Sequence, residues 1–71
     1  MSAETTANLV RMANQIAANL AAGGEQAAIE ETARHIRLYW DPRMKAAIRE
    51  VPADQLSPIA GAAIRALAEQ S

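Results

Sequence analysis

Residues 35–44 read His35-Ile36-Arg37-Leu38-Tyr39-Trp40-Asp41-Pro42-Arg43-Met44 and contain the only Trp, the only Tyr and the only His of the chain. Within this segment, the Asp41-Pro42 pair predicts the end of one helix and the start of another. The residue before a Pro avoids the helical conformation, Asp is a preferred helix N-cap, and Pro is a preferred first helical residue. We therefore expect a helix boundary here, with the aromatic residues directly before it.

Helical periodicity extends upstream of this boundary. Residues 25–40 show one amphipathic pattern and residues 3–22 show another, and the two are separated by Gly23-Gly24. We expect the first of these glycines to take the left-handed conformation that commonly ends a helix. Because a short Gly turn between two helices favours antiparallel neighbours, the first forty residues predict a helical hairpin.

Two shorter helices are predicted downstream, over residues 42–51 and about 58–69, with Ser57-Pro58 repeating the cap-then-Pro arrangement. No strand pattern is visible, so we expect an all-α fold in one domain over residues 1–71. The expected core consists of the apolar faces of the four helices. These faces are Leu9, Met12, Ala13, Ile16, Ala17 and Leu20; Ala28, Ile29, Thr32, Ala33, Ile36 and Trp40; Met44, Ala47, Ile48 and Val51; and Ile59, Ala62, Ala63, Ala66 and Leu67.

Composition limits what this domain can do alone. Half of the residues are nominally hydrophobic, but 18 of them are Ala and none is Phe. A core this small predicts a marginal monomer, and we expect self-association or a larger partner that covers apolar surface. The absence of Cys excludes disulfides and thiolate metal sites and is consistent with a reducing cytosol. We see no signal peptide and no apolar run long enough for a membrane helix.

Candidate catalytic or metal-binding sets are missing from the sequence. Glu30 and Glu31 are adjacent on a helix and so point in different directions. Glu31 and His35 have i,i+4 spacing, but two ligands alone make a weak metal site. We therefore expect no catalytic, cofactor-binding or metal-binding residues and interpret the chain as a non-enzyme.

Several residues have two open interpretations. Trp40 is either the centre of the core or a contact for a partner, since Trp, Tyr and Arg are enriched at interface hot spots. We expect His35 to be a half-buried structural residue, with a partner contact as the alternative. Asn14 and Gln15 belong either to a solvated face or to a hydrogen-bonding edge at an interface.

The cations form a cluster, because Arg34, Arg37, Arg43, Lys45 and Arg49 fall within sixteen residues. Arg43 and Lys45 lie in the first turn of a predicted helix, where the macrodipole disfavours cations. Arg43 therefore pairs either with a nearby carboxylate, such as that of Asp41, or with an acidic group on a partner. A small helical nucleic-acid-binding or regulatory protein is the alternative function. The net charge of −1 does not favour it, since phosphate binding generally requires a clearly basic surface.

Two motifs resemble a known family, the small delta subunit of NAD-dependent, molybdenum-containing formate dehydrogenases. The first motif is residues 9–17, Leu-Val-Arg-Met-Ala-Asn-Gln-Ile-Ala, and the second is the His35 to Met44 segment, with its aromatic–Trp pair and Asp-Pro-Arg-Met. The later segment Leu56-Ser57-Pro58-Ile59 also fits the family pattern. The resemblance covers most of residues 8–67.

This resemblance implies a non-catalytic accessory subunit of a cytoplasmic complex, without a cofactor of its own. Its partner would be the large catalytic subunit, and its role would lie in assembly, cofactor maturation or stability of the complex. The motif positions, together with the aromatic and basic residues beside them, are our candidate partner-binding residues. They are Arg11, Asn14, Gln15, His35, Tyr39, Trp40, Asp41, Arg43 and Met44.

Overall fold

The N-terminal half of the protein is an antiparallel helical hairpin. The computed structural model describes residues 3–69, in which α1 spans Ala3–Leu20 and α2 spans Glu25–Tyr39. A short 3-10 helix, η1 (Ala21–Gly23), continues from α1. The following residue, Gly24, has φ 101° and ψ 151°, a conformation that side chains disfavour. The expectation for the first glycine was therefore wrong, because Gly23 is still helical and Gly24 makes the turn.

The C-terminal half contains α3 (Pro42–Arg49), a 3-10 helix η2 (Ala53–Gln55) and α4 (Pro58–Glu69). Residues 3–69 contain no strand, so the predicted all-α fold of a hairpin followed by two shorter helices is confirmed. The third helix ends two residues earlier than expected, since Glu50 is already its C-cap.

Both predicted cap-then-Pro boundaries are present. The Met44 backbone N–H donates to Asp41 Oδ1 at 2.9 Å, and Pro42 is the first residue of α3. The Ala60 N–H donates to Ser57 Oγ at 3.2 Å in the first turn of α4. Each side chain satisfies a backbone donor that the first turn of a helix leaves without an intrahelical partner.

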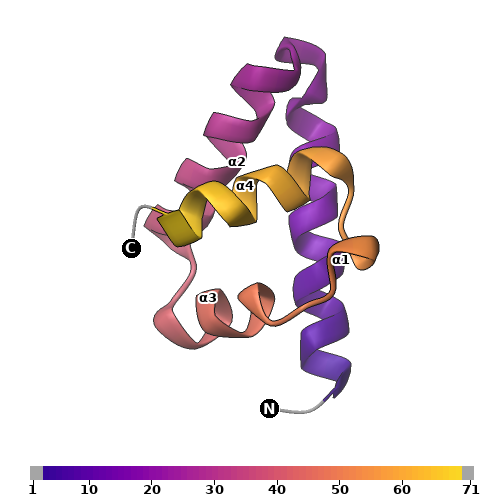
Figure 1. Cartoon of the computed structure of the whole chain (residues 1–71), viewed down its shortest axis with the longest axis vertical. Helices are drawn as coiled ribbons and strands as arrows, with labels where there is room; N and C mark the ends of the chain where they lie inside the picture. Colours follow the sequence, from indigo (N-terminus) through magenta and orange to yellow (C-terminus); the bar gives the residue numbers. More distant parts are fainter. Residues whose placement is uncertain (1–2, 70–71) are drawn as a thin grey trace.

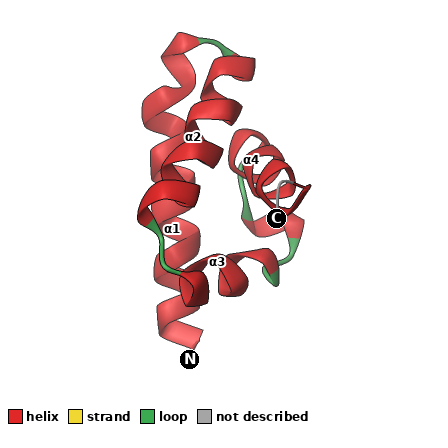
Figure 2. Cartoon of the chain, turned by 90° about the vertical axis from the view of Figure 1, so that its left-hand side faces the viewer, coloured by secondary structure: helices red, strands yellow, loops and turns green. Residues whose placement is uncertain are grey.

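The two shorter helices cover one side of the hairpin. In Figure 1, α4 crosses in front of the hairpin, and α3 lies below α4. The helix α4 packs chiefly against α2 and also contacts α1 and α3. Figure 2 shows α1 and α2 together on one side and α3 and α4 on the other. The opposite side of the hairpin is therefore covered by no other helix of the described chain.

The core lies between the hairpin and this second layer. All six positions predicted for α2 are buried or half-buried, but Met12 of α1 is 42% exposed, contrary to expectation. In α4, Ala60, Gly61 and Ile64 are buried although the predicted stripe omitted them. The hydrophobic cluster joins both halves of the chain and comprises Leu9, Ala13, Ala17, Ile36, Trp40, Ile48, Val51, Ala60, Ile64 and Leu67.

No helix in the described part of the chain combines the length and the apolar character needed to cross a membrane.

Candidate interaction surface

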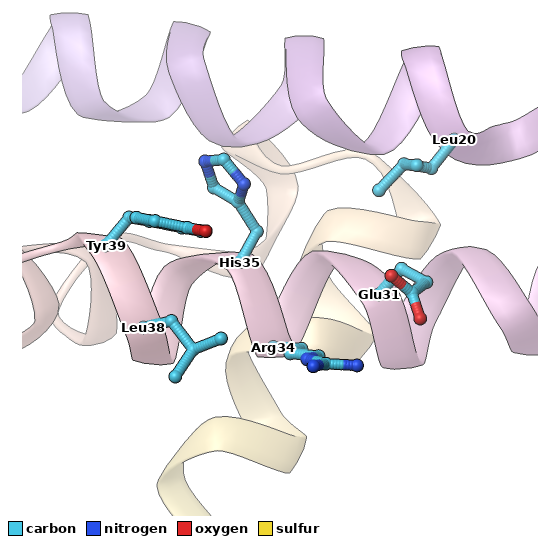
Figure 3. A pocket seen from close by; sticks show the side chains of 6 residues that line it. All are labelled: Leu20, Glu31, Arg34, His35, Leu38 and Tyr39. Carbon is cyan, nitrogen blue, oxygen red and sulfur yellow. The ribbon is translucent and has the colours of Figure 1, made fainter.

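The uncovered side of the hairpin carries two adjoining hollows between α1 and α2. His35 lines both, so the hollows form one continuous surface, which we call the hairpin face. Figure 3 looks onto the second hollow, with α4 behind the two helices. The first hollow is lined by Arg11, Met12, Gln15, Ile16, His35 and Trp40, and the second by Leu20, Glu31, Arg34, His35, Leu38 and Tyr39.

Large hydrophobic side chains are exposed on the hairpin face. Met12 is 42% exposed, Leu38 is 56% exposed and Tyr39 is 73% exposed. These three are the exposed large hydrophobic residues among those whose burial the structure describes, and each lines one of the two hollows. Contiguous exposed apolar surface bordered by polar groups marks interaction sites more often than single exposed residues do.

His35 and Tyr39 form an aromatic pair on this face. Their ring centroids lie 4.9 Å apart with an interplanar angle of 47°. Figure 3 shows the His35 ring directed toward α1, with the Tyr39 ring beside it. The expectation of a half-buried His35 was wrong, because the buried stripe of α2 runs through Thr32 and Ile36 and leaves position 35 exposed.

Trp40 belongs to the core. It is only 5% exposed and packs in the same cluster as Ile36 and Ile48. Its backbone is extended at the C-cap of α2, and its backbone N–H donates to the Ile36 carbonyl at 3.0 Å. Of the two interpretations of Trp40, the structure therefore confirms the one that places this residue in the core. Trp40 also lines the first hollow, but it is too deeply covered to insert into a partner as an anchor.

The α1 motif residues point to different sides of the molecule. Arg11 donates a hydrogen bond to Asn8, and Gln15 Nε2 donates to Asn19 Oδ1 at 3.1 Å, both on the exposed surface of α1. Asn14 instead faces the second layer. Its Nδ2 donates to the Gln55 carbonyl at 3.1 Å, and its Oδ1 accepts from the Ser57 N–H at 2.8 Å.

Three of the other candidate residues line neither hollow. Asp41 is occupied as the cap of α3, and Met44 is half-buried against the core. Arg43 is exposed and makes no hydrogen bond or ion pair within the described residues, so the first of its two alternatives, a pairing with a nearby carboxylate such as Asp41, is not formed there. The unfavourable position of the Lys45 charge in the first turn of α3 is offset locally. Its Nζ donates to the Arg37 carbonyl at 3.3 Å, near the negative end of α2.

Sequence reasoning missed Leu38 as a surface residue and misplaced Met12 in the core. Leu38 carried a usable signal, because it is a large apolar residue outside the predicted stripe of its helix. Met12 carried none, since its position fits the stripe of α1. Within residues 3–69, the structure also brings no group of three or more His, Cys, Asp or Glu residues close enough to hold a metal ion.

Together, these features define a small all-α protein with one open face that combines apolar, aromatic and basic side chains. The family model described as NADH-dependent formate dehydrogenase delta subunit, FdsD, matches residues 8–64. The chain belongs to this family. The match includes α1 from residue 8 onward, all of α2 and α3, and all nine candidate partner-binding residues. No curated protein and no solved structure gives a significant match.

Proposed function

We propose that the chain is a non-catalytic accessory subunit of a cytoplasmic, NAD-dependent, molybdenum-containing formate dehydrogenase complex. It docks through the hairpin face on the large catalytic subunit and supports assembly, cofactor maturation or stability of the complex. The family match supports the complex, and the gathering of Met12, Leu38 and Tyr39 on one uncovered face supports the docking site. A partner that binds only the folded chain also stabilises that fold by mass action.

The chemistry of the hairpin face supports binding better than catalysis. The histidine and the carboxylate that line its hollows, His35 and Glu31, both have side chains that are exposed to solvent. An active site normally encloses its substrate, excludes water and brings a nucleophile or base together with an orienting partner. Exposed Met and Tyr side chains beside Arg are instead typical of protein interfaces.

Affinity capture tests this proposal. The tagged chain is expressed with the other subunits of the complex, and the bound chains and bound molybdenum are measured. We expect the large subunit to be captured, and the double variant Met12→Ser plus Leu38→Ser to capture at least about tenfold less of it, because hot-spot truncation typically costs 2 kcal/mol or more.

The matched control is Ala46→Ser plus Ala68→Ser, which places the same residue at exposed positions of α3 and α4. This control variant should capture the large subunit as the unmodified chain does, and circular dichroism should show equal helicity in all three proteins. Recovery of the tagged chain without the large subunit, or equal capture of the large subunit by both double variants, contradicts the proposal.

A further inference from the structure

We infer that the hairpin face binds an acidic amphipathic segment of its protein partner, in which a carboxylate is flanked by aliphatic side chains. This inference rests on the docking role proposed above. It adds the chemistry of the partner, which follows from how charge and apolar surface are distributed on the face.

Charge on the hairpin face is predominantly positive. Arg11 is the only charged residue of the chain between Glu4 and Glu25, so the α1 side of the first hollow carries a cation and no carboxylate. On the α2 side, Arg34 and His35 line the second hollow together with one carboxylate, that of Glu31. Figure 3 shows Glu31 on the Leu20 side of the view, with Tyr39 at the other end. The one carboxylate that lines the hollows therefore lies away from the Tyr39 end of the face.

These cations are not neutralised within the described chain. Arg34 forms no ion pair with Glu31, although the two lie one turn apart in α2, and Arg34 has no other hydrogen-bond partner there. Arg11 is bonded to the side chain of Asn8, which carries no charge. A carboxylate that binds among these groups would form charge-assisted hydrogen bonds, which are stronger than those between neutral groups.

The apolar residues define what flanks that carboxylate. Met12, Ile16 and Trp40 line the first hollow, and Leu38 and Tyr39 line the second hollow. An aliphatic side chain can occupy either hollow while a neighbouring carboxylate reaches Arg11 or Arg34. A partner segment that carries both kinds of side chain matches the face better than a purely charged one.

A second copy of this chain is a poorer occupant of the face. In a two-fold symmetric dimer the same surface patch meets itself. Such a contact would bring Arg11 and Arg34 of the two copies together, with Glu31 as the one carboxylate that lines the hollows of each copy. Juxtaposed like charges disfavour that arrangement and favour a partner of opposite charge.

Charge reversal tests the inference on the assembled complex. Arg11→Glu and Arg34→Glu are compared with the control Arg65→Glu, which makes the same charge change at an exposed position of α4, outside the family match. Dissociation constants for the large subunit are measured at low and at high salt. We expect each hairpin-face variant to bind roughly threefold to tenfold more weakly at low salt, the difference to shrink at high salt, and Arg65→Glu to bind normally.

Two results separate the possible failures. If the unmodified chain binds no subunit of the complex, the proposed function itself is wrong, and the inference falls with it. If the unmodified chain binds, and Met12→Ser plus Leu38→Ser weakens binding while both charge reversals leave it unchanged, the docking site stands and the acidic partner segment is refuted.

Cross-linking identifies the segment directly. The chain has no Cys, so Gln15→Cys introduces a unique thiol at an exposed position that lines the first hollow. The thiol carries a short photo-reactive cross-linker, and the attached peptide is sequenced. We expect a peptide of the large subunit with Asp or Glu beside aliphatic residues. A peptide without acidic residues, or one from a second copy of this chain, overturns the inference.

Discussion

Thr32 is the one polar residue found in the buried core of the described chain. It is 0% exposed in α2, and its hydroxyl has no hydrogen-bond partner among the described residues. Ala60 and Ala63 of α4, which packs chiefly against α2, are also fully buried. A buried polar group without a partner costs about 1–3 kcal/mol of desolvation. The Thr32 hydroxyl therefore subtracts from stability, while its methyl group fills space in the core.

Thr32→Val is expected to raise the free energy of unfolding by about 1 kcal/mol, because it removes the unpaired hydroxyl and nearly preserves the shape. The matched variant Thr32→Ser keeps the hydroxyl and loses the methyl, so it should lower stability. Urea unfolding followed by circular dichroism measures both changes. A lower unfolding midpoint for Thr32→Val than for the unmodified chain would show that the hydroxyl is satisfied.

Residue burial was predictable where periodicity and packing agree, as in α2. The prediction of burial failed at Met12, because the apolar stripe of a helix does not show how much of that stripe other elements will cover. The second layer covers the hairpin from one side only, so one edge of the α1 stripe stays exposed. The prediction that His35 is half-buried failed for a related reason, since this residue lies next to buried positions in sequence but on another side of the helix.

At the scale of elements, one side chain connects α1 to the end of η2 and to the residue before α4. Asn14 binds Gln55 and Ser57 through both ends of its amide, across more than forty residues of sequence. The Ser57 N–H is partly buried and depends on this acceptor. Asn14 therefore helps to fix where α4 begins relative to the hairpin.

Asn14→Ala is expected to lower the free energy of unfolding by about 1–3 kcal/mol, since it breaks two hydrogen bonds and leaves a partly buried donor unpaired. Gln15→Ala is the neighbouring control. Its hydrogen bond is exposed, so the change should stay within about 0.5 kcal/mol. Native-state hydrogen exchange should also show faster exchange of the Ser57 amide in Asn14→Ala. Equal stability of the two variants would refute this role.

The two glycines of the hairpin turn make a second matched pair. Gly24→Ala forces a Cβ into a conformation with φ 101° and should cost about 1–3 kcal/mol. Gly23→Ala places a Cβ in open space at a helical residue and should be neutral or stabilising by up to about 1 kcal/mol. Thermal unfolding of both variants measures the difference. The reverse order of stability would mean that Gly23 makes the turn.

Element boundaries were largely predictable because local chemistry sets them. Asp41-Pro42 and Ser57-Pro58 each place a cap and a restricted φ at the first turn, and both helices begin there. The end of α3 was less predictable, since Pro52 limits only how far the helix can continue. The crossing of α4 over the hairpin was not predictable, because it depends on contacts between residues far apart in sequence, such as that of Asn14 with Ser57.

At the scale of the whole molecule, the fold is a hairpin with a second layer on one side. Both shorter helices, α3 and α4, pack on the same side of the hairpin, so neither of them covers the other side (Figure 2). The exposed Met12, Leu38 and Tyr39 side chains remain on the open side, together with Arg11 and Arg34. We propose that the catalytic subunit of the complex supplies the missing cover.

Hydroxyl-radical footprinting of the chain, alone and in the purified complex, tests this docking most directly, because it reports the solvent exposure of individual side chains. Met44 is half-buried against the core and serves as the internal reference for Met12. We predict that Met12 and Tyr39 become strongly protected in the complex, while the reactivity of Met44 stays nearly constant. Unchanged reactivity of Met12 and Tyr39 in a complex that contains the chain would contradict docking through the hairpin face.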